Sequence, residues 1–245
     1  MGPCFVDCHS HVVPSGDDGA QALSDGLALC ELAARAGTQI LYATPHVWPH
    51  LVLTEQREQA IRAAFEELRA EAPLELRLGF ELTPAPPLLA EDPARYALEG
   101  TKVVLVEVPF AGPADGLVAL AEHIEAAGLV PLIAHPERTE AVRDRPALAE
   151  ELAERGWRLQ VNSTSLLGRH GAEAEAIAWR LVENRHARAV ASDGHRLARP
   201  ARLDDAYELV VARVGEEAAA PLFDGTALRH SFATPTLEAP PALPA

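Results

Sequence analysis

The chain has 245 residues, and its 21 Lys and Arg against 36 Asp and Glu give a formal net charge of −15. This acid excess disfavours a protein that holds nucleic acid or an anionic membrane through its general surface field, because both partners require excess positive charge. With 48% hydrophobic and 23% charged residues, the composition is that of an ordinary globular protein. The length favours one domain of α/β-barrel size.

The N-terminus and the cysteines indicate the compartment. Asp7 and His9 stand where a signal peptide would be apolar, and no apolar run approaches the ~18 residues of a membrane span. Cys4, Cys8 and Cys30 are too few for a disulfide framework and odd in number, and we expect Cys4 and Cys30 to be core residues. The sequence therefore predicts a cytoplasmic protein without direct membrane insertion.

Apolar runs of strand length alternate along the chain with longer stretches of helical period. The elements expected in the first half are a strand at 4–9, a helix at 22–36, a strand at 39–43, a helix from 54 to about 70, a strand at 74–80, and a loop or short helix at 91–100. Gly37 is a stop signal for the first helix, and Thr54 can cap the second.

The second half repeats the pattern. The expected elements are a strand at 102–108, a helix at 115–127, a strand at 129–134, a helix at 146–155, a strand at 157–161, a helix at 172–183, a strand at 187–192, and closing helices at 203–214 and 216–222. Asp115 is expected to cap its helix, and Gly128 and Gly156 to end theirs. The Pro-rich segment 233–245 is expected to be disordered, which leaves residues 1–232 as one domain.

About seven strands, each joined to the next through helical or long segments, imply parallel strands with right-handed crossovers. We therefore predict an α/β fold, a single distorted (β/α)7 barrel, in which the C-terminal ends of the strands meet at one mouth. Polar residues, most of them of metal-ligand type, stand at these ends: Asp7, His9, His11, His46, Glu81, Glu107, His135, Asn162, Asp193 and His195.

The histidine motifs are weak signals when taken one at a time. In DCHSH, residues at alternate strand positions face the same side of the sheet, so His9 and His11 can coordinate one ion. Cys8 then points to the opposite side. SDGH places Asp193 and His195 in the same relation. Polar strand ends with histidines are also common without a metal, and an Asp that caps a helix beside a surface His is the simpler alternative for SDGH.

The two strand-end glutamates are harder to explain without a cation. Glu81 and Glu107 stand in apolar company, where an uncompensated carboxylate is costly. The alternative is a buried ion pair, which would depend on Arg because Lys102 is the only lysine. Several His and carboxylates converging at one mouth would repel one another without metal. Mixed imidazole and carboxylate ligation suits Zn²⁺, Mn²⁺ or Fe²⁺, and carboxylates can bridge, so we expect more than one ion.

The ordered succession of DCHSHVVPSGDDGA, ATPH, GFEL, VEVP, IAHPER, QVNSTSLLG and ASDGH…RP resembles the PHP (polymerase and histidinol phosphatase) superfamily. More narrowly, it resembles the manganese-dependent protein-tyrosine phosphatases of bacterial capsule and exopolysaccharide systems. The resemblance covers residues 5–222, and it implies a PHP-type barrel with the metal site at the C-terminal ends of the strands.

The resemblance also implies a set of metal ligands for three ions, most simply Mn²⁺, with Fe²⁺ or Zn²⁺ as alternatives. The matched ligands are His9, His11, Asp18, His46, Glu81, Glu107, His135, Asp193 and His195. Asp17 is the rival of Asp18 for one of these places.

Two arginines fall on phosphate-binding positions of that family, Arg138 in HPER and Arg199 before Pro200. The segment between His195 and Arg199 is one residue shorter than in the family pattern, so Arg196 and Arg202 compete with Arg199.

The implied activity is hydrolysis of phosphotyrosine by a metal-bridging hydroxide, with a bacterial tyrosine autokinase as the protein substrate. A phenol with a pKa of about 10 leaves with less help from an acid than an aliphatic alcohol does. A cysteine mechanism has no support because no C-x5-R motif occurs. Two alternatives stay open: a small-molecule phosphatase of the histidinol-phosphate type, and a non-catalytic metal-binding barrel.

The remaining candidates are expected to serve packing or the surface. This applies to the histidines outside the motifs, which are His50, His123, His170, His186 and His230. Trp48, Trp157 and Trp179 are expected to be packing residues, with the alternative that Trp48, close after His46, lines the mouth and contacts an aromatic leaving group. Asn162 is expected to orient ligands from behind.

Overall fold

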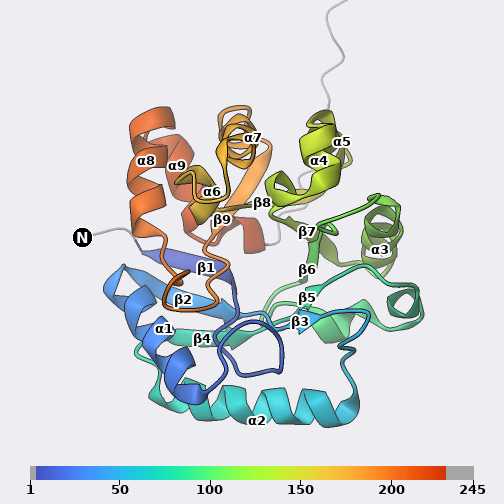
Figure 1. Ribbon diagram of the computed structural model, residues 1–245, viewed down its shortest axis with the longest axis vertical. Coiled ribbons are helices and arrows are strands. Elements are labelled where there is room, and N and C mark those ends of the chain that lie inside the picture. The colour runs from blue at the N-terminus through green and yellow to red at the C-terminus, as the bar shows by residue number, and fades with distance from the viewer. Residues whose placement is uncertain (1–3, 230–245) are drawn as a thin grey trace, which may run out of the picture.

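The structure is a computed structural model that describes residues 4–229. Parallel strands run through its centre, and α-helices form an outer ring around them (Figure 1). The strands are β1 (Phe5–Ser10), β2 (Thr38–Ala43), β3 (His46–Val47), β4 (Glu75–Leu78), β5 (Glu81–Leu82), β6 (Val103–Glu107), β7 (Val130–Ala134), β8 (Arg158–Asn162) and β9 (Ala187–Ala191). The helices are α1 (Leu23–Arg35), α2 (Glu55–Glu71), α3 (Asp115–Ala126), α4 (Glu140–Asp144), α5 (Ala147–Glu154), α6 (Ser163–Leu166), α7 (Ala172–Glu183), α8 (Asp204–Val214) and α9 (Glu216–Phe223).

The strands pair in the orders β1-β2-β4 and β3-β5-β6-β7-β8-β9, and all named pairs are parallel. Strand β3 follows β2 after two residues, and β5 follows β4 after two residues. Backbone hydrogen bonds from Gly79 to Ala43 (2.9 Å) and from Glu81 to Pro45 (3.2 Å) carry the pairing across both interruptions. The nine strands therefore form the seven strand lines that the sequence predicted.

The first and last strand lines meet at the mouth. The Asp193 amide donates to the His9 carbonyl (3.0 Å), and the His11 amide donates to the Gly194 carbonyl (2.7 Å). The α/β fold with parallel strands is thus confirmed. Among the described strands the pairing is divided between two sheets, so the predicted barrel is not continuously hydrogen-bonded.

Apolar residues fill two layers, because alternate strand residues face opposite sides of the sheet. The odd residues of β6, Val103 and Leu105, belong to a cluster that contains no α-helical residue and lies inside the ring of strands. The even residues, Val104 and Val106, join a larger cluster with the surrounding helices. Glu107 is the next odd residue of β6, so its side chain faces the same interior as those of Val103 and Leu105. Because it is the last residue of the strand, its carboxylate lies at the C-terminal end of that interior.

The starts of α2 and α3 show how far local signals fix the helix ends. The Thr54 hydroxyl accepts a hydrogen bond from the Arg57 amide (3.2 Å) and caps α2 as expected. Asp115 was expected to cap α3, but it is the first residue of the helix, and the preceding Ala114 occupies the cap position without a side-chain bond. Its carboxylate in the first turn still favours the helix dipole.

Three further expectations need comment. The strand predicted at 74–80 is shorter than expected: β4 ends at Leu78, and β5 begins only at Glu81, beyond the predicted range. Gly79 between them lies so close to Leu98 that an added Cβ would be 2.4 Å from its side chain. Cys4 is exposed rather than a core residue, whereas Cys8 and Cys30 are buried. The segment 233–245 lies outside the described residues.

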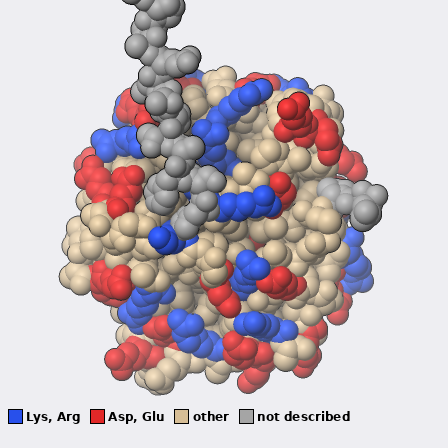
Figure 2. Space-filling view, turned by 180° about the vertical axis from the view of Figure 1, so that it is seen from behind, with Lys and Arg blue, Asp and Glu red and all other residues tan. Residues whose placement is uncertain are grey.

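The surface neutralises many of its arginines locally. Pairs one helical turn apart, such as Arg62 with Glu58 (2.8 Å), are typical. On the face shown in Figure 2, acidic and basic side chains are interspersed. Within residues 4–229, none of the helices has the length and apolar character that crossing a bilayer requires.

Candidate metal centre

The ends of the strands bring the predicted ligand residues together. His9 lies in β1 and His11 just after it, His46 begins β3, Glu81 begins β5, Glu107 ends β6, His135 follows β7, and Asp193 and His195 follow β9. All eight side chains are buried.

His9 and His11 form the first group of converging atoms, together with two carboxylates. Their Nε2 atoms lie 3.1 Å apart. Glu81 Oε2 lies 3.1 Å from His9 Nε2 and 3.4 Å from His11 Nε2. Asp193 Oδ1 lies 3.4 Å and 3.3 Å from the same two nitrogens. Four ligand-type atoms from three segments thus lie close together.

Glu81 connects this group to two others. Its Oε2 lies 3.0 Å from His46 Nδ1, and its Oε1 lies 2.9 Å from His135 Nε2. Glu107 joins His46 and Glu81 in a group whose ligand atoms all lie within 4.8 Å of one another. Because one carboxylate serves several groups, the arrangement is suited to more than one cation.

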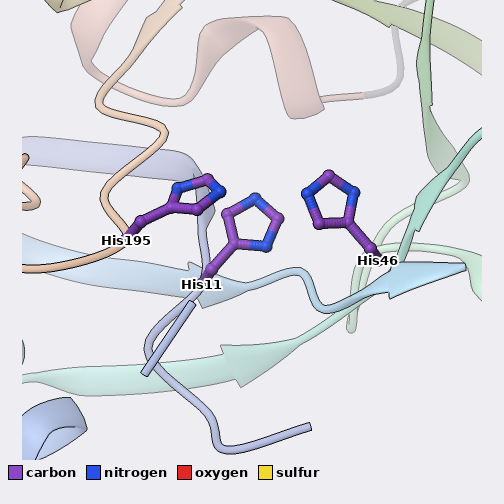
Figure 3. Close-up of side chains that lie close together, drawn as sticks. All are labelled: His11, His46 and His195. Carbon is purple, nitrogen blue, oxygen red and sulfur yellow. The ribbon is translucent and has the colours of Figure 1, made fainter. Parts of the chain in front are cut away.

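A further group consists of His11, His46 and His195, whose rings converge from three segments (Figure 3). The His11 ring centroid lies 4.3 Å from that of His46 and 3.9 Å from that of His195.

Asp17 and Asp18 take different places beside these rings. Asp18 Oδ1 lies 3.5 Å from His46 Nε2 and 3.3 Å from His195 Nε2, with about half of the side chain open to solvent. The buried Asp17 accepts the amides of Gly19 and His46, each at 3.0 Å. Asp17 therefore shapes the loop, and Asp18 faces the ring nitrogens.

Close packing fixes the loop that carries His11. A Cβ at Gly19 would lie 2.5 Å from the His11 carbonyl oxygen, and one at Gly26 of α1 would lie 2.1 Å from the Val12 carbonyl oxygen. Only a residue without a side chain permits these approaches.

A chain of side-chain amides holds two of the converging groups from behind. His9 Nδ1 lies 2.9 Å from Gln160 Oε1, Gln160 Nε2 donates to Asn162 Oδ1 (2.8 Å), and Asn162 Nδ2 donates to Asp193 Oδ2 (2.8 Å). Asn162 thus contacts Asp193, one of the predicted ligands, and its orienting role stays a prediction. Sequence reasoning missed Gln160, although it stands two residues before Asn162 on the same strand and hence on the same face.

Arg138 and Arg199 both reach Asp193. Arg138 Nη1 lies 2.5 Å from Asp193 Oδ2, and Arg199 Nη2 lies 3.2 Å from Asp193 Oδ1. The two competitors lie elsewhere: Arg196 donates to the Asp18 carbonyl (3.0 Å), and Arg202 pairs with Asp204 (2.5 Å).

The electrostatics of the centre require positive charge. Burial and the neighbouring Glu81 carboxylate raise the pKa of Glu107 to about 8. Burial also opposes ionisation of Glu81, but the charges of His9 and His46 outweigh it and hold the pKa of Glu81 well below its ordinary value.

Several buried ligand-type atoms make no hydrogen bond of suitable geometry among the described residues, even where two of them lie as close as the 3.0 Å between Glu81 Oε2 and His46 Nδ1. They are Glu81 Oε2, Glu107 Oε2, and the Nδ1 atoms of His11, His46 and His135. Leaving such polar atoms unsatisfied is costly. The donor set therefore fits a multinuclear cation site.

His135 and Asp193 have positive φ angles of 32° and 52°. Residues other than glycine rarely adopt this left-handed conformation, which costs of order 1–3 kcal/mol and is concentrated at functional sites. The surrounding contacts to Glu81 and the two arginines hold both residues in place.

His170 is half-buried in the loop after α6. Its Nδ1 lies 3.0 Å from the Ser165 hydroxyl, which donates to Glu137 Oε1 (2.7 Å). Burial and the charges of Arg138 and Arg199 lower the pKa of His170 to about 4. No sequence motif singled it out, because it lies in a loop rather than at a strand end.

Comparison with known proteins shows the family to which the chain belongs. The family model described as "Capsular polysaccharide synthesis, CpsB/CapC" matches residues 5–229. The chain belongs to the CpsB/CapC family. The family match includes every strand line and every residue of the metal centre named above.

Two proteins of known name illustrate the relationship. Tyrosine-protein phosphatase YwqE of Bacillus subtilis is 32% identical over 200 residues, which cover 79% of this chain and 78% of that protein. Tyrosine-protein phosphatase CpsB of Streptococcus agalactiae serotype V is 28% identical over 233 residues, covering 89% and 95%.

Solved structures give the same relationship. A structure reported for YwqE from Bacillus subtilis and CpsB from Streptococcus pneumoniae, described as unique metal-dependent tyrosine phosphatases, has a TM-score of 0.80 and 30% identity, covering 89% of this chain and 91% of that one. An inactive dihydroorotase-like domain from Chaetomium thermophilum has a TM-score of 0.60 at 9% identity, covering 92% and 78%. The second likeness concerns the fold alone, and it places the CpsB/CapC chain among barrel-like α/β folds.

Proposed function

We propose that this chain is a metal-dependent protein-tyrosine phosphatase. The observation that carries the proposal is the convergence of buried His and carboxylate atoms around Glu81 and Asp193, with Arg138 and Arg199 anchored on the same Asp193. Membership of the CpsB/CapC family, whose relatives YwqE and CpsB bear the name tyrosine-protein phosphatase, supports it.

The ligands that we propose for three divalent cations, most simply Mn²⁺, are His9, His11, Asp18, His46, Glu81, Glu107, His135, Asp193 and His195. We choose Asp18 over Asp17 because the carboxylate of Asp17 is already committed to two backbone amides. Imidazole and carboxylate donors without thiolate suit Mn²⁺, Fe²⁺ and Zn²⁺.

When bound, divalent cations at such a site supply an acidified water and neutralise charge on a phosphoryl group. The residues of the chain do the remaining work. Arg138 and Arg199 are partly exposed and can turn from Asp193 to make charge-assisted bonds with phosphoryl oxygens. Gln160 and Asn162 keep His9 and Asp193 in position. The phenolate of tyrosine, with a pKa of about 10, leaves without a strong acid.

The cysteines are poorly suited to act as nucleophiles. Burial raises the pKa of the Cys30 thiol to about 12 and that of Cys8 further, so neither forms a thiolate at neutral pH. Cys4 is exposed on the outside of β1 beside Gln39. The proposed enzyme thus depends on cations rather than on a thiol.

The natural substrate that we propose is a phosphotyrosine protein, and specifically a tyrosine autokinase of capsule or exopolysaccharide synthesis. The printed name of the family, which refers to capsular polysaccharide synthesis, supports this choice.

The test uses the full chain stripped with chelator and reloaded with Mn²⁺. We expect two to three ions per chain by elemental analysis, hydrolysis of a phosphotyrosine peptide, and much slower hydrolysis of the matched phosphoserine peptide and of histidinol phosphate. His135→Ala should lower ion content and rate together, whereas the matched control His186→Ala, far from the centre, should leave both unchanged. Preference for histidinol phosphate would point to the small-molecule phosphatase, and ion binding without hydrolysis of any substrate to a non-catalytic barrel.

A further inference from the structure

Two aromatic side chains stand against the metal centre without being part of it. Phe110 lies in the loop after β6, three residues beyond Glu107, and is 46% exposed. Trp48 directly follows β3 and is half-buried. A large apolar ring exposed beside a polar site calls for an explanation beyond core packing.

Phe110 is held in a defined orientation despite its exposure. Its ring is nearly parallel to that of His135, at 16° with a centroid distance of 5.4 Å. The Arg138 guanidinium carbon lies 4.9 Å from the Phe110 ring centroid, within cation–π range. The ring therefore touches both a proposed ligand and the proposed phosphate-binding arginine.

Trp48 stacks on His46 in the way that Phe110 stacks on His135. Its ring centroid lies 4.2 Å from that of His46 at an angle of 25°, and 5.2 Å from that of His50 at an angle of 22°, so the ring is stacked on two histidines. His46 contacts Glu81 Oε2, and His135 contacts Glu81 Oε1. Because the two imidazoles bind the two oxygens of one carboxylate, Trp48 and Phe110 flank Glu81 from two directions.

We infer that Phe110, with Trp48 beside it, determines specificity for the proposed phosphotyrosine substrate by contacting the aryl ring of the leaving group. The inference rests on the proposed function and deepens it. Because the Arg138 guanidinium lies 4.9 Å from the Phe110 ring centroid, a phosphoryl group bound by Arg138 would lie beside this ring, and an aryl ester of that group would meet an aromatic surface. The short side chain of phosphoserine offers no ring to fill that place, so it gains nothing from the contact.

The contact between Phe110 and an aryl ligand is favourable because the Phe110 ring is already held in place before the ligand binds. An aromatic pair is stabilised by offset stacking or edge contact beyond its buried area, and a ring already held in place loses little freedom when the substrate arrives. From these contributions we expect Phe110 to improve binding of an aryl ligand about five- to ten-fold.

Inhibition by phosphonates tests the inference without requiring turnover of an alkyl substrate. In the Mn²⁺-loaded full chain, Phe110→Ala should raise the inhibition constant of phenylphosphonate about five- to ten-fold and leave that of methylphosphonate within two-fold. KM for a phosphotyrosine peptide should rise in parallel, and kcat should change less. Phe110→Tyr should keep the selectivity for aryl ligands, and Phe110→Leu should lose it while preserving apolar volume. Leu209→Ala, which removes an equally exposed side chain from α8, is the control.

Ion content is measured for every variant. If Phe110→Ala weakens the binding of both phosphonates equally and also loses ions, Phe110 supports His135 rather than the substrate. That result would overturn the inference. Unchanged phenylphosphonate binding in both Phe110→Ala and Trp48→Ala would also overturn it. If Phe110→Ala fails to fold, Phe110→Leu and Trp48→Leu decide the matter. If the wild-type protein hydrolyses no phosphotyrosine peptide, the proposed function is wrong. The comparison of the two phosphonates still shows whether Phe110 and Trp48 contact an aryl group.

Discussion

Gln160 should tune the affinity of the centre for cations although it touches none of them. Its Oε1 accepts from His9 Nδ1 at 2.9 Å, and its Nε2 donates to Asn162 Oδ1 at 2.8 Å. The first bond fixes the His9 tautomer with the proton on Nδ1, which leaves Nε2 free to bind a cation. Gln160→Leu keeps similar bulk but removes both bonds.

The magnitude follows from what the substitution leaves unpaired. His9 Nδ1 is completely buried, and an unsatisfied buried donor costs about 1–3 kcal/mol. This cost applies to the cation-loaded state, because only a bound cation on Nε2 requires the His9 proton to stay on Nδ1. At ~1.4 kcal/mol per factor of ten, the expected loss of Mn²⁺ affinity is about 5- to 150-fold.

Isothermal titration calorimetry of the chelator-stripped protein with Mn²⁺ measures this change in affinity directly. Activity should fall at limiting Mn²⁺ and recover largely at high Mn²⁺. Gln160→Glu keeps the acceptor toward His9 and should retain more affinity than Gln160→Leu. Gln39→Leu, on the exposed side of β2, serves as the control. An unchanged Mn²⁺ affinity in Gln160→Leu would refute the reasoning that this amide sets the His9 tautomer.

Three further perturbations test separate parts of the structure. Arg138→Ala should keep its ions but lower kcat/KM for a phosphotyrosine peptide about 100-fold, equivalent to ~2.7 kcal/mol, with partial rescue by Arg138→Lys; normal kinetics would make this arginine a structural partner only. Gly19→Ala should displace the His11 loop and reduce ion content, because its Cβ would lie 2.5 Å from the His11 carbonyl oxygen; full ion content by elemental analysis would contradict that. Thr54→Ala should destabilise the fold by about 1 kcal/mol in urea unfolding without changing activity, because the Arg57 amide loses its cap; an unchanged unfolding midpoint would show that the cap contributes nothing.

The sequence by itself determined the order of the elements and the residue types at the strand ends. Strand and helix periods are local properties of the chain, so the alternation of the predicted segments was enough to predict seven parallel strand lines. Because parallel strands end at one face, the His and carboxylate residues after those strands could be assigned to a common mouth. The motifs around His9, His135 and Asp193 allowed the family to be recognised.

Only the tertiary structure decided between neighbours and between distant candidates. Asp17 and Asp18 are adjacent and chemically identical, and the loop conformation alone commits one of them to backbone amides. Arg199 and Arg202 are three residues apart, and the path of the chain after β9 brings only the first to Asp193.

The same reason explains the residues that sequence reasoning missed or undervalued. Gln160 matters because it reaches His9, 151 residues away in the chain. Phe110 matters because its loop places it on His135 and Arg138. Which strand end a residue follows can be read from a local pattern, but which distant group its side chain meets is settled only when the barrel packs.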